Sequence, residues 1–309
     1  MSKLPVSVFM IIKNEEENLQ ECLENLLWAA ELIIVDTGSS DKSIEIAKKF
    51  TDKVFIEKWE GFGKTKNKAL LHTNLDWVFS IDADERVTND LKKEIEIAIK
   101  NERIDGYYIK RLPYFLGKPV FHGGWYPGWV LRLFKKKKGR FSNKNIHEKI
   151  QLEGKTAFLE NDLIHLTYPT VEEYIRKLNI YTTISAKEVL NDGKQAKMID
   201  IFVRPAALFI KMYFLKMGFL DGINGFILAV FSSIYPLLKY SKAYFFEKKR
   251  RMNDKKKNRK ILVIKSRGLG DTILMIPFLE NLKSYFSESD IDVMINEKYI
   301  NLLKSIDFI

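Results

Sequence analysis

The sequence has a single cysteine, Cys22, in 309 residues. One cysteine excludes a disulfide framework within the chain and fits a reducing compartment. Long apolar runs are also scarce: the run FILAVFSSIYPLL has 13 residues, too few to span a bilayer. The N-terminal run VSVFMII continues directly into KNEEEN without a small-residue cleavage site, so no signal peptide is predicted. These absences predict a cytoplasmic protein.

Acidic residues are outnumbered, 40 against 51 basic ones, which gives a formal net charge of +11. This excess implies a polyanionic neighbour, which could be nucleic acid, an anionic membrane face or a phosphorylated glycolipid. The aromatic residues form no recognisable nucleic-acid-binding motif, so nucleic acid is not expected. A non-catalytic polyanion-binding protein remains an alternative, and its binding would collapse with added salt and need neither metal nor nucleotide sugar.

The first 110 residues alternate between strand and helix patterns. Strands are predicted for the apolar runs 6–12, 31–36, 53–57 and 76–82. Helices are predicted for 16–29 and 41–50, the second of them capped by Ser40 or Asp41. Alternating strands and helices indicate an α/β domain with a Rossmann-like, mainly parallel sheet.

Polar side chains follow the predicted strands, where ligands of parallel sheets bind. Lys13, Asn14 and Glu15 follow the first strand, and Asp36 follows the second. Asp82 and Asp84 follow the fourth strand, two positions apart, so in an extended chain their carboxylates project to the same side. Such a pair could hold a hard divalent cation that clamps the phosphates of a nucleotide. A solvated, charged loop is the alternative.

Several segments carry a resemblance to a known family. KNEEENL, IIVDTGSSDKS, GFGKTKNKAL and SIDADERV, in this order, resemble the inverting glycosyltransferases of family 2, which have a GT-A-type fold. YFLGKPVFHGGWYPGWVLRLF, NIHEKI, LIHLTY and GFLDGINGF narrow the resemblance to lipopolysaccharide core enzymes that add a β-linked glucose to a heptose. The resemblance covers residues 4–246. It implies UDP-glucose as donor, Mg²⁺ or Mn²⁺ as cofactor, and a lipid-linked core oligosaccharide as acceptor.

The resemblance also assigns donor-binding residues. Asp36 would bind the uracil or ribose, with Asn14 and Glu15 nearby. Asp82 would contact the ribose or the metal, and Asp84 would be the principal metal ligand. For Asp36, Asn14 and Glu15 the alternative is strand-end capping or a solvated loop.

The diphosphate would face Lys66, together with Asn67 or Lys64. The family often has arginine where this chain has Lys66, and lysine lacks the bidentate fork of arginine, so orientation would be looser. His165, in the apolar segment DLIHLTY, would bind the metal or pyrophosphate, or would be a hydrogen-bonded core residue.

Inverting transfer needs a base that removes the proton of the acceptor hydroxyl. Glu148 in NIHEKI is the predicted base, while His147 could replace it or orient it. Trp125, Tyr126 and Arg132 suit an acceptor sugar, because aromatic faces stack on sugars and arginine pairs with phosphate. Related sequences usually have an acidic residue where this chain has Gly128, so any role of that acid would be lost or reassigned.

Helical patterns follow residue 168. Thr170 and Glu173 predict a capping box for a helix that stops at Gly193, and Pro205 suits the first turn of a second helix. Apolar faces near lysines predict helices that lie on an anionic membrane surface, which would make the protein peripheral on the inner face of the cytoplasmic membrane. Packing on the catalytic domain or on a second subunit is the alternative, and the oligomeric state is left open.

The C-terminal part reads as a basic linker and the start of a second fold. Residues 247–260 contain nine basic and two acidic residues. Residues 261–309 show a strand, a glycine turn and a helix, and resemble the beginning of the family 9 lipopolysaccharide heptosyltransferases, with Asp271 at the catalytic-base position. We therefore expect a GT-A-type domain at 1–168, an amphipathic helical region at 169–246, the linker at 247–260 and a truncated βαβ fragment at 261–309. An inactive glycosyltransferase remnant is the remaining alternative.

Overall fold

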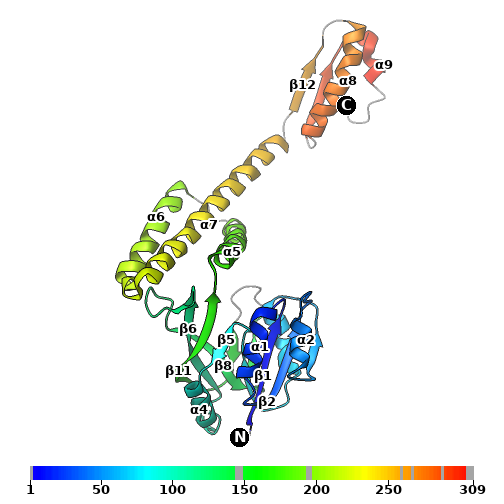
Figure 1. Ribbon diagram of the computed structural model, residues 1–309. Coiled ribbons are helices and arrows are strands. Elements are labelled where there is room, and N and C mark those ends of the chain that lie inside the picture. Colours follow the sequence, from blue (N-terminus) through cyan, green and yellow to red (C-terminus); the bar gives the residue numbers. More distant parts are fainter. Residues whose placement is uncertain are drawn as a thin grey trace. The chain divides into compact units, whose positions relative to one another are not determined.

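A computed structural model describes residues 3–142, 149–192, 197–257, 260–265, 268–286 and 289–303 (Figure 1). The chain divides into two compact units. The first comprises Met1–Lys177 and Ala206–Ser233, and the second comprises Leu178–Pro205 and Ile234–Ile309. All residues of the candidate site described below belong to the first unit.

The N-terminal half of the main sheet is parallel, as predicted. Its strands are β1 (Leu4–Ile12), β2 (Ala29–Asp36), β3 (Val54–Ile56) and β4 (Trp77–Ser80), in the order β3-β2-β1-β4. Its helices are α1 (Glu16–Asn25), α2 (Ser43–Lys48) and α3 (Phe62–Leu71). The predicted cap of α2 by Ser40 or Asp41 was wrong, because Lys42 is the N-cap residue; the carboxylate of Asp41 still accepts a hydrogen bond from the Ser43 N–H at 3.0 Å.

The other half of the sheet is mixed, which the sequence did not predict. Its strands are β8 (Gly128–Lys135), β6 (Gly106–Phe115), β11 (Thr156–Tyr168) and β5 (Glu85–Val87), and the order continues β4-β8-β6-β11-β5. The short β7 (Lys118–Pro119) pairs with β6, β9 (Gly139–Phe141) pairs with β10 (Ile150–Leu152), and α4 (Asn89–Ala98) follows β5. This half contains both parallel and antiparallel pairs because β8 runs opposite to β4 and β6, and β5 runs opposite to β11.

The strand registers bring several chain segments to one edge of the sheet. β8 runs antiparallel to both β4 and β6, so its first residues pair with the later part of β6 and precede the residues that pair with β4. Arg111 near the end of β6 pairs with Gly128 at the start of β8. His165 near the end of β11 pairs with Glu85 at the start of β5. The carboxyl ends of β1, β2, β4, β6 and β11 therefore share this edge with the beginnings of β5 and β8.

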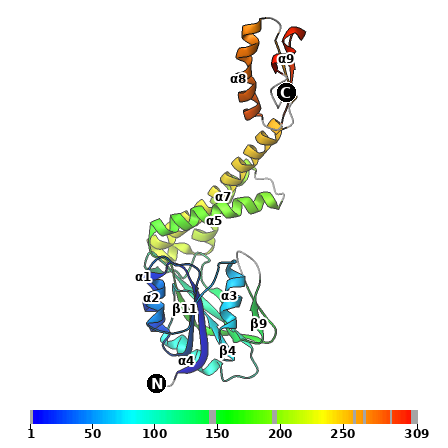
Figure 2. The ribbon, with the colours of Figure 1, turned by 90° about the vertical axis from the view of Figure 1, so that its right-hand side faces the viewer.

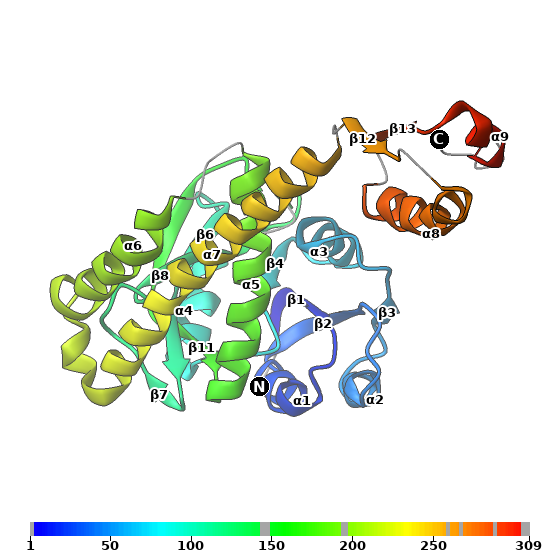
Figure 3. The same ribbon diagram turned by 90° about the horizontal axis from the view of Figure 1, so that it is seen from above.

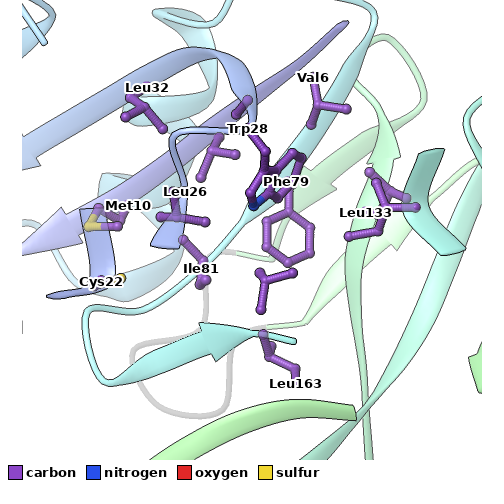
Figure 4. Packing of buried hydrophobic residues seen from close by; sticks show 14 of the residues in the cluster. Val6, Met10, Cys22, Leu26, Trp28, Leu32, Phe79, Ile81, Leu133 and Leu163 are labelled. Carbon is purple, nitrogen blue, oxygen red and sulfur yellow. The ribbon is translucent and has the colours of Figure 1, made fainter. Parts of the chain in front are cut away.

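Successive side chains of β1 point to opposite faces of the sheet, and each face has its own apolar core. Val8 and Met10 join the larger cluster under α1, α2 and α4, whereas Phe9 joins the cluster under α3 and β9. Figures 2 and 3 show strands of the sheet between α1 and α2 on one side and α3 on the other. Figure 4 shows the packing of the larger cluster, where Cys22 and Phe79 are fully buried. Burying each large apolar side chain contributes about 1.5–3 kcal/mol.

Helices follow β11, with one departure from the prediction. α5 (Val171–Asn191) begins as expected, since the Thr170 hydroxyl accepts a hydrogen bond from the Glu173 N–H at 3.2 Å. α6 (Met198–Ile210) contains Pro205 in its interior, so the prediction that Pro205 lies in the first turn was wrong. The helix begins earlier, at Met198, and continues through Pro205 despite the missing proline N–H. A π-helix η1 (Lys211–Leu215) and a 3₁₀-helix η2 (Gly218–Asp221) follow.

The helix α7 (Gly222–Lys257) is much longer than its uncharged run. Pro236 does not end it, and within the described residues the segment Gly218–Arg250 is long and apolar enough to cross a membrane by length and composition. The 13-residue run predicted that this region is too short to span a bilayer. That prediction is wrong, because the helix in the structure is long enough. Length and composition alone do not place the helix in a membrane.

The C-terminal segment has the predicted strand–helix–strand order. β12 (Lys260–Ile264) and β13 (Asp290–Met294) pair in parallel, and α8 (Leu269–Tyr285) connects them. A short 3₁₀-helix η3 (Glu297–Tyr299) and α9 (Ile300–Leu303) follow. The side chain of Asp271 lies outside the described part of the chain, and the resemblance of this segment to family 9 stays a prediction, as do the four segment boundaries.

Candidate active site

Arg132 is the centre of a buried charge cluster at the shared sheet edge. Its Nη2 atom donates to Asp82 Oδ2 at 2.6 Å and to Glu85 Oε1 at 2.6 Å. Lys66 donates from Nζ to the other carboxylate oxygen of Asp82, Oδ1, at 3.2 Å. Arg132 and Lys66 are both buried and Glu85 is fully buried, whereas the side chain of Asp82 is 34% exposed. Asp82 is therefore the member of the cluster that reaches the open edge.

The two cations keep Asp82 ionised. Burial by itself would raise the pKa of the Asp82 carboxyl, but the charges and hydrogen bonds of Arg132 and Lys66 outweigh it and hold that pKa well below its usual range. Burial would likewise lower the pKa of Arg132, and the two carboxylates instead raise it. Both oxygens of Asp82 are engaged by protein cations, which makes this carboxylate a supporting group at the site.

Asp84 faces a different partner. Its Oδ2 atom lies 3.4 Å from Nε2 of His165, whose Nδ1 is 3.2 Å from the hydroxyl of Thr167. The chain from Asp82 to Glu85 forms a turn in which the Glu85 N–H donates to the Asp82 carbonyl at 3.0 Å. The extended-chain argument that the two aspartates project to one side was therefore wrong in its geometry. Within the described residues, no group of three or more His, Cys, Asp or Glu side chains converges as a metal site.

Asp36 and Asn14 organise one loop. The carboxylate of Asp36 is almost fully buried and accepts hydrogen bonds from the N–H groups of Gly38 at 2.8 Å and Ser39 at 3.0 Å. Asn14 accepts from the Ser40 N–H at 2.8 Å. Gly38 has a φ of +100°, a conformation that favours glycine. These contacts fix the loop after β2 at the same sheet edge, so both residues hold backbone in place where a nucleoside is predicted to bind.

Glu15 lies close enough to Asp84 for their charges to interact. Burial raises the pKa of the Glu15 carboxyl, a hydrogen bond from Asn18 lowers it, and the negative charge of Asp84 raises it further. Lys177 near the start of α5 partly offsets this effect. The ends of β1 and β4 thus face a common space.

The three predicted diphosphate residues occupy different surroundings. Lys66 belongs to the Asp82 cluster. Asn67 uses its amide to donate to the Phe141 carbonyl at 2.9 Å and to accept from the Phe141 N–H at 2.8 Å, so it fastens α3 to β9. Lys64 is exposed to solvent. Of these three, only Lys66 lies beside an aspartate of the site.

A pocket of about 180 Å³ has His165, the partner of Asp84, in its lining. It is lined by Arg111, Pro113, Trp125, Gly128, His165 and Thr167. Trp125 is held edge-on against Phe115, with ring centroids 6.4 Å apart. Trp125 was predicted to face the acceptor, and it lines this pocket.

The other predicted acceptor residues have protein partners. The Tyr126 hydroxyl donates to Asp162 Oδ1 at 3.0 Å, and Arg132 is engaged by Asp82 and Glu85. The sequence reasoning missed Arg111, whereas Glu85 was weighed as either a salt-bridge partner or a substrate contact and forms an ion pair with Arg132. Arg111 lies inside β6 and is brought to the site by its register opposite Gly128, which no local sequence signal predicts. His147 and Glu148, the candidate bases, lie outside the described residues.

Comparisons with known sequences identify the family of this chain. The family described as Glycosyl transferase family 2 matches residues 7–152. The chain is 32% identical over 255 residues to the lipopolysaccharide core biosynthesis glycosyltransferase LpsC of Rhizobium meliloti. This alignment covers 78% of this chain and 93% of that protein. It is 27% identical over 250 residues to an uncharacterized glycosyltransferase of Rickettsia typhi, covering 77% of this chain and 86% of that protein.

Two solved structures show more distant likeness. S. aureus TarS, residues 1–349, gives a TM-score of 0.39 at 15% identity and covers 82% of this chain and 92% of that one. Glucosyl-3-phosphoglycerate synthase from Mycobacterium tuberculosis, in complex with Mn²⁺ and UDP-glucose, gives a TM-score of 0.30 at 22% identity and covers 35% of this chain and 43% of that one. The assignment rests instead on the family match and on the long alignment with the R. meliloti protein. The chain therefore belongs to glycosyl transferase family 2 and is a glycosyltransferase with the predicted GT-A-type α/β fold.

Proposed function

We propose that this glycosyltransferase transfers glucose from UDP-glucose, with inversion, to a heptose or similar sugar of a lipid-linked lipopolysaccharide core. The observation that carries the proposal is the meeting, at one sheet edge, of the Asp36 loop, the turn that carries Asp84, and the pocket beside Trp125. The nucleoside would lie at the Asp36 loop, the diphosphate at the Asp84 turn, and the acceptor in the pocket. The relative LpsC supports the choice of acceptor, because its name places it in lipopolysaccharide core biosynthesis.

The donor side fits a divalent cation that the diphosphate helps to hold. Asp84 offers a partly exposed carboxylate, and the imidazole of His165 lies beside it. Two side chains are too few for a complete coordination shell, so oxygens of the donor and water would have to supply the rest, as is common for Mg²⁺. A bound Mg²⁺ or Mn²⁺ would neutralise charge that develops on the departing diphosphate. Asp82 would act by keeping Lys66 and Arg132 in position.

The acceptor side supplies orientation. An aromatic face such as Trp125 stacks on the C–H surface of a sugar, and the rigid pocket wall limits the direction from which a hydroxyl approaches. Removal of the hydroxyl proton is assigned, as a prediction, to Glu148 with His147 as its partner or substitute.

The acceptor is anchored in lipid, and one surface of the first unit suits a membrane. Exposed apolar side chains gather over η1, η2 and the adjoining helix ends: Ile210, Phe214, Leu215, Met217, Phe219, Leu220, Ile223 and Phe226. Lys211 and Lys216 are exposed among them. Apolar side chains with interspersed lysines are typical of segments that lie in the interface of anionic membranes. We therefore propose peripheral attachment to the cytoplasmic membrane from the cytoplasmic side.

Vesicle binding tests this attachment. Leu215→Ser should reduce co-sedimentation with vesicles that contain anionic lipid. Leu71→Ser is the matched control, because Leu71 is equally exposed, 75% against 73%, but lies on α3. Equal binding of both variants, or dimerisation through this surface in solution, would instead favour packing against a second subunit.

The proposed reaction is tested by release of nucleoside diphosphate from UDP-, GDP- and ADP-sugars, with Mn²⁺ or Mg²⁺ and a core oligosaccharide acceptor. Release from UDP-glucose that requires both metal and acceptor is expected. Absence of release across the panel, from folded protein that also fails to bind UDP, would favour the inactive or polyanion-binding alternative.

A further inference from the structure

Arg111 lines the same pocket as Trp125. Its side chain is 31% exposed, and its Nη1 atom is 3.7 Å from Glu85 Oε1, beyond hydrogen-bond distance. Glu85 already receives closer donors: Arg132 Nη2 at 2.6 Å on Oε1 and the Asp82 N–H at 3.0 Å on Oε2. The Nε atom of Arg111 is buried and has no hydrogen-bond partner among the described residues. Arg111 thus keeps donors available for a ligand.

The residue opposite Arg111 adds no second carboxylate beside Glu85, the ion-pair partner that Arg111 shares with Arg132. Gly128 pairs with Arg111 across β8 and β6 and lines the same pocket. A Cβ atom at position 128 would meet the Trp125 carbonyl at 3.5 Å and Cβ and the carbonyl of Arg111 at 3.9 Å, which are ordinary contacts. The backbone and the available space therefore permit a larger residue there. An acidic one would lie beside the guanidinium and compete for it.

We propose that the pocket binds an acidic acceptor sugar, and that Arg111 pairs with its phosphate or carboxylate group. Guanidinium groups match both anions through paired N–H donors, and a half-buried site strengthens such a pair. The aromatic face of Trp125 would hold the sugar ring, and the hydroxyl of Thr167 adds a polar contact. Arg111 is thus a specificity-determining residue. This inference rests on the proposed transferase function and specifies the chemistry of its acceptor.

The test compares three acceptors: a neutral heptose glycoside, the same glycoside with a phosphate monoester, and the same glycoside with a carboxylate. Wild-type protein should favour one of the two charged acceptors through a lower KM, and the better of the two identifies the anion. Arg111→Gln should raise the KM for that acceptor by at least about tenfold while changing the neutral one little. Arg103→Gln, an exposed arginine outside the pocket, is the control for loss of one positive charge.

A second pair of variants tests position 128, where glycine leaves space for a side chain. Gly128→Asp adds a carboxylate beside Arg111, and Gly128→Asn adds a side chain of nearly the same size without the charge. The Asp variant should bind the charged acceptor about tenfold more weakly than the Asn variant. Equal effects of Asp and Asn would overturn the proposal, because the cause would then be volume alone.

Direct binding separates this inference from the proposed function. Each glycoside is titrated into UDP-saturated protein by calorimetry, which needs no turnover, and UDP affinity is measured for each variant. Loss of charged-glycoside binding in Arg111→Gln with unchanged UDP affinity supports the proposal even if transfer is not observed. A weaker affinity for UDP in Arg111→Gln would place Arg111 at the donor and overturn it, as would equal binding of neutral and charged glycosides by wild type. Thermal melting of every variant shows whether the fold is retained.

Discussion

Arg132 on β8 donates to the carboxylate of Asp82 after β4 at 2.6 Å, across the junction between the parallel and mixed halves of the sheet. The same nitrogen serves the fully buried Glu85. Arg132→Met should therefore leave buried negative charge without its closest partner and lower the free energy of unfolding by about 3–5 kcal/mol. Urea unfolding measures this change.

Arg140→Met is the control for Arg132, because Arg140 is exposed on the short strand β9. Its effect should stay below about 1 kcal/mol. A loss at position 132 as small as that at position 140 would mean that the carboxylates find other partners, and the described cluster would not support the sheet junction.

Glu31 on β2 gives the fold a specific acid sensitivity far from the candidate site. Burial alone would raise the pKa of its carboxyl, but hydrogen bonds from Lys53, Ser7 and Asn74 lower it from 4.5 to about 2. Because the folded-state pKa is depressed, the stabilisation is complete above pH 4.5 and is lost as the pH falls toward 2. Glu31→Gln should cost about 1.5–3 kcal/mol near neutral pH and flatten this part of the pH profile.

Unfolding curves from neutral to acidic pH check the prediction for Glu31. Glu96→Gln, at a half-exposed position on α4, should keep the slope of the wild-type profile. Parallel profiles of wild type and Glu31→Gln would show that another carboxylate is responsible for the acid sensitivity.

Asp221 in η2 holds the loop that carries Trp125. Its carboxylate accepts hydrogen bonds from the His122 N–H at 2.8 Å and the Phe121 N–H at 3.4 Å, and lies 2.8 Å from His122 Nδ1. Asp221→Ala should loosen this loop and raise the KM for the acceptor by about tenfold, because orientation is lost, while UDP affinity stays unchanged. Steady-state kinetics with acceptor varied, set beside a UDP titration, separates the two effects.

A matched variant for Asp221 is Asp90→Ala, which removes an exposed carboxylate from α4. It should leave the acceptor KM unchanged. If Asp221→Ala weakens UDP binding as strongly as acceptor binding, the loop serves the whole site and the division into donor and acceptor sides is incorrect.

The sequence predicted the N-terminal strands and the residues at their ends because each strand is a short apolar run with a polar residue directly after it. It did not predict the mixed half of the sheet, because the direction of β8 is set by pairing between segments far apart in the chain. Arg132 was predicted to contact the acceptor because it follows an aromatic motif in the sequence. Its contact with Asp82 depends on the β4–β8 pairing, which joins segments far apart in the chain.

Local patterns also misled in two places. Asp82 and Asp84 were taken as an extended pair, but the turn from Asp82 to Glu85 sends them to different partners. Pro205 was taken as a helix start, but the helix begins at Met198 and continues through Pro205 despite one missing hydrogen bond. Arg111 went unnoticed because nothing in its local sequence distinguishes it from neighbouring basic residues, whereas the register opposite Gly128 does.

The central claim is that Asp84 holds a divalent cation through which the nucleotide diphosphate binds. The most direct measurement is UDP affinity, with and without Mn²⁺, for the wild type and for Asp84→Asn, which keeps the shape of the side chain and removes its charge. Wild type should bind UDP at least about tenfold more tightly with Mn²⁺, and Asp84→Asn should lose that gain while melting as the wild type does. UDP binding that is indifferent to Mn²⁺, or a metal effect that survives in Asp84→Asn, would contradict the account.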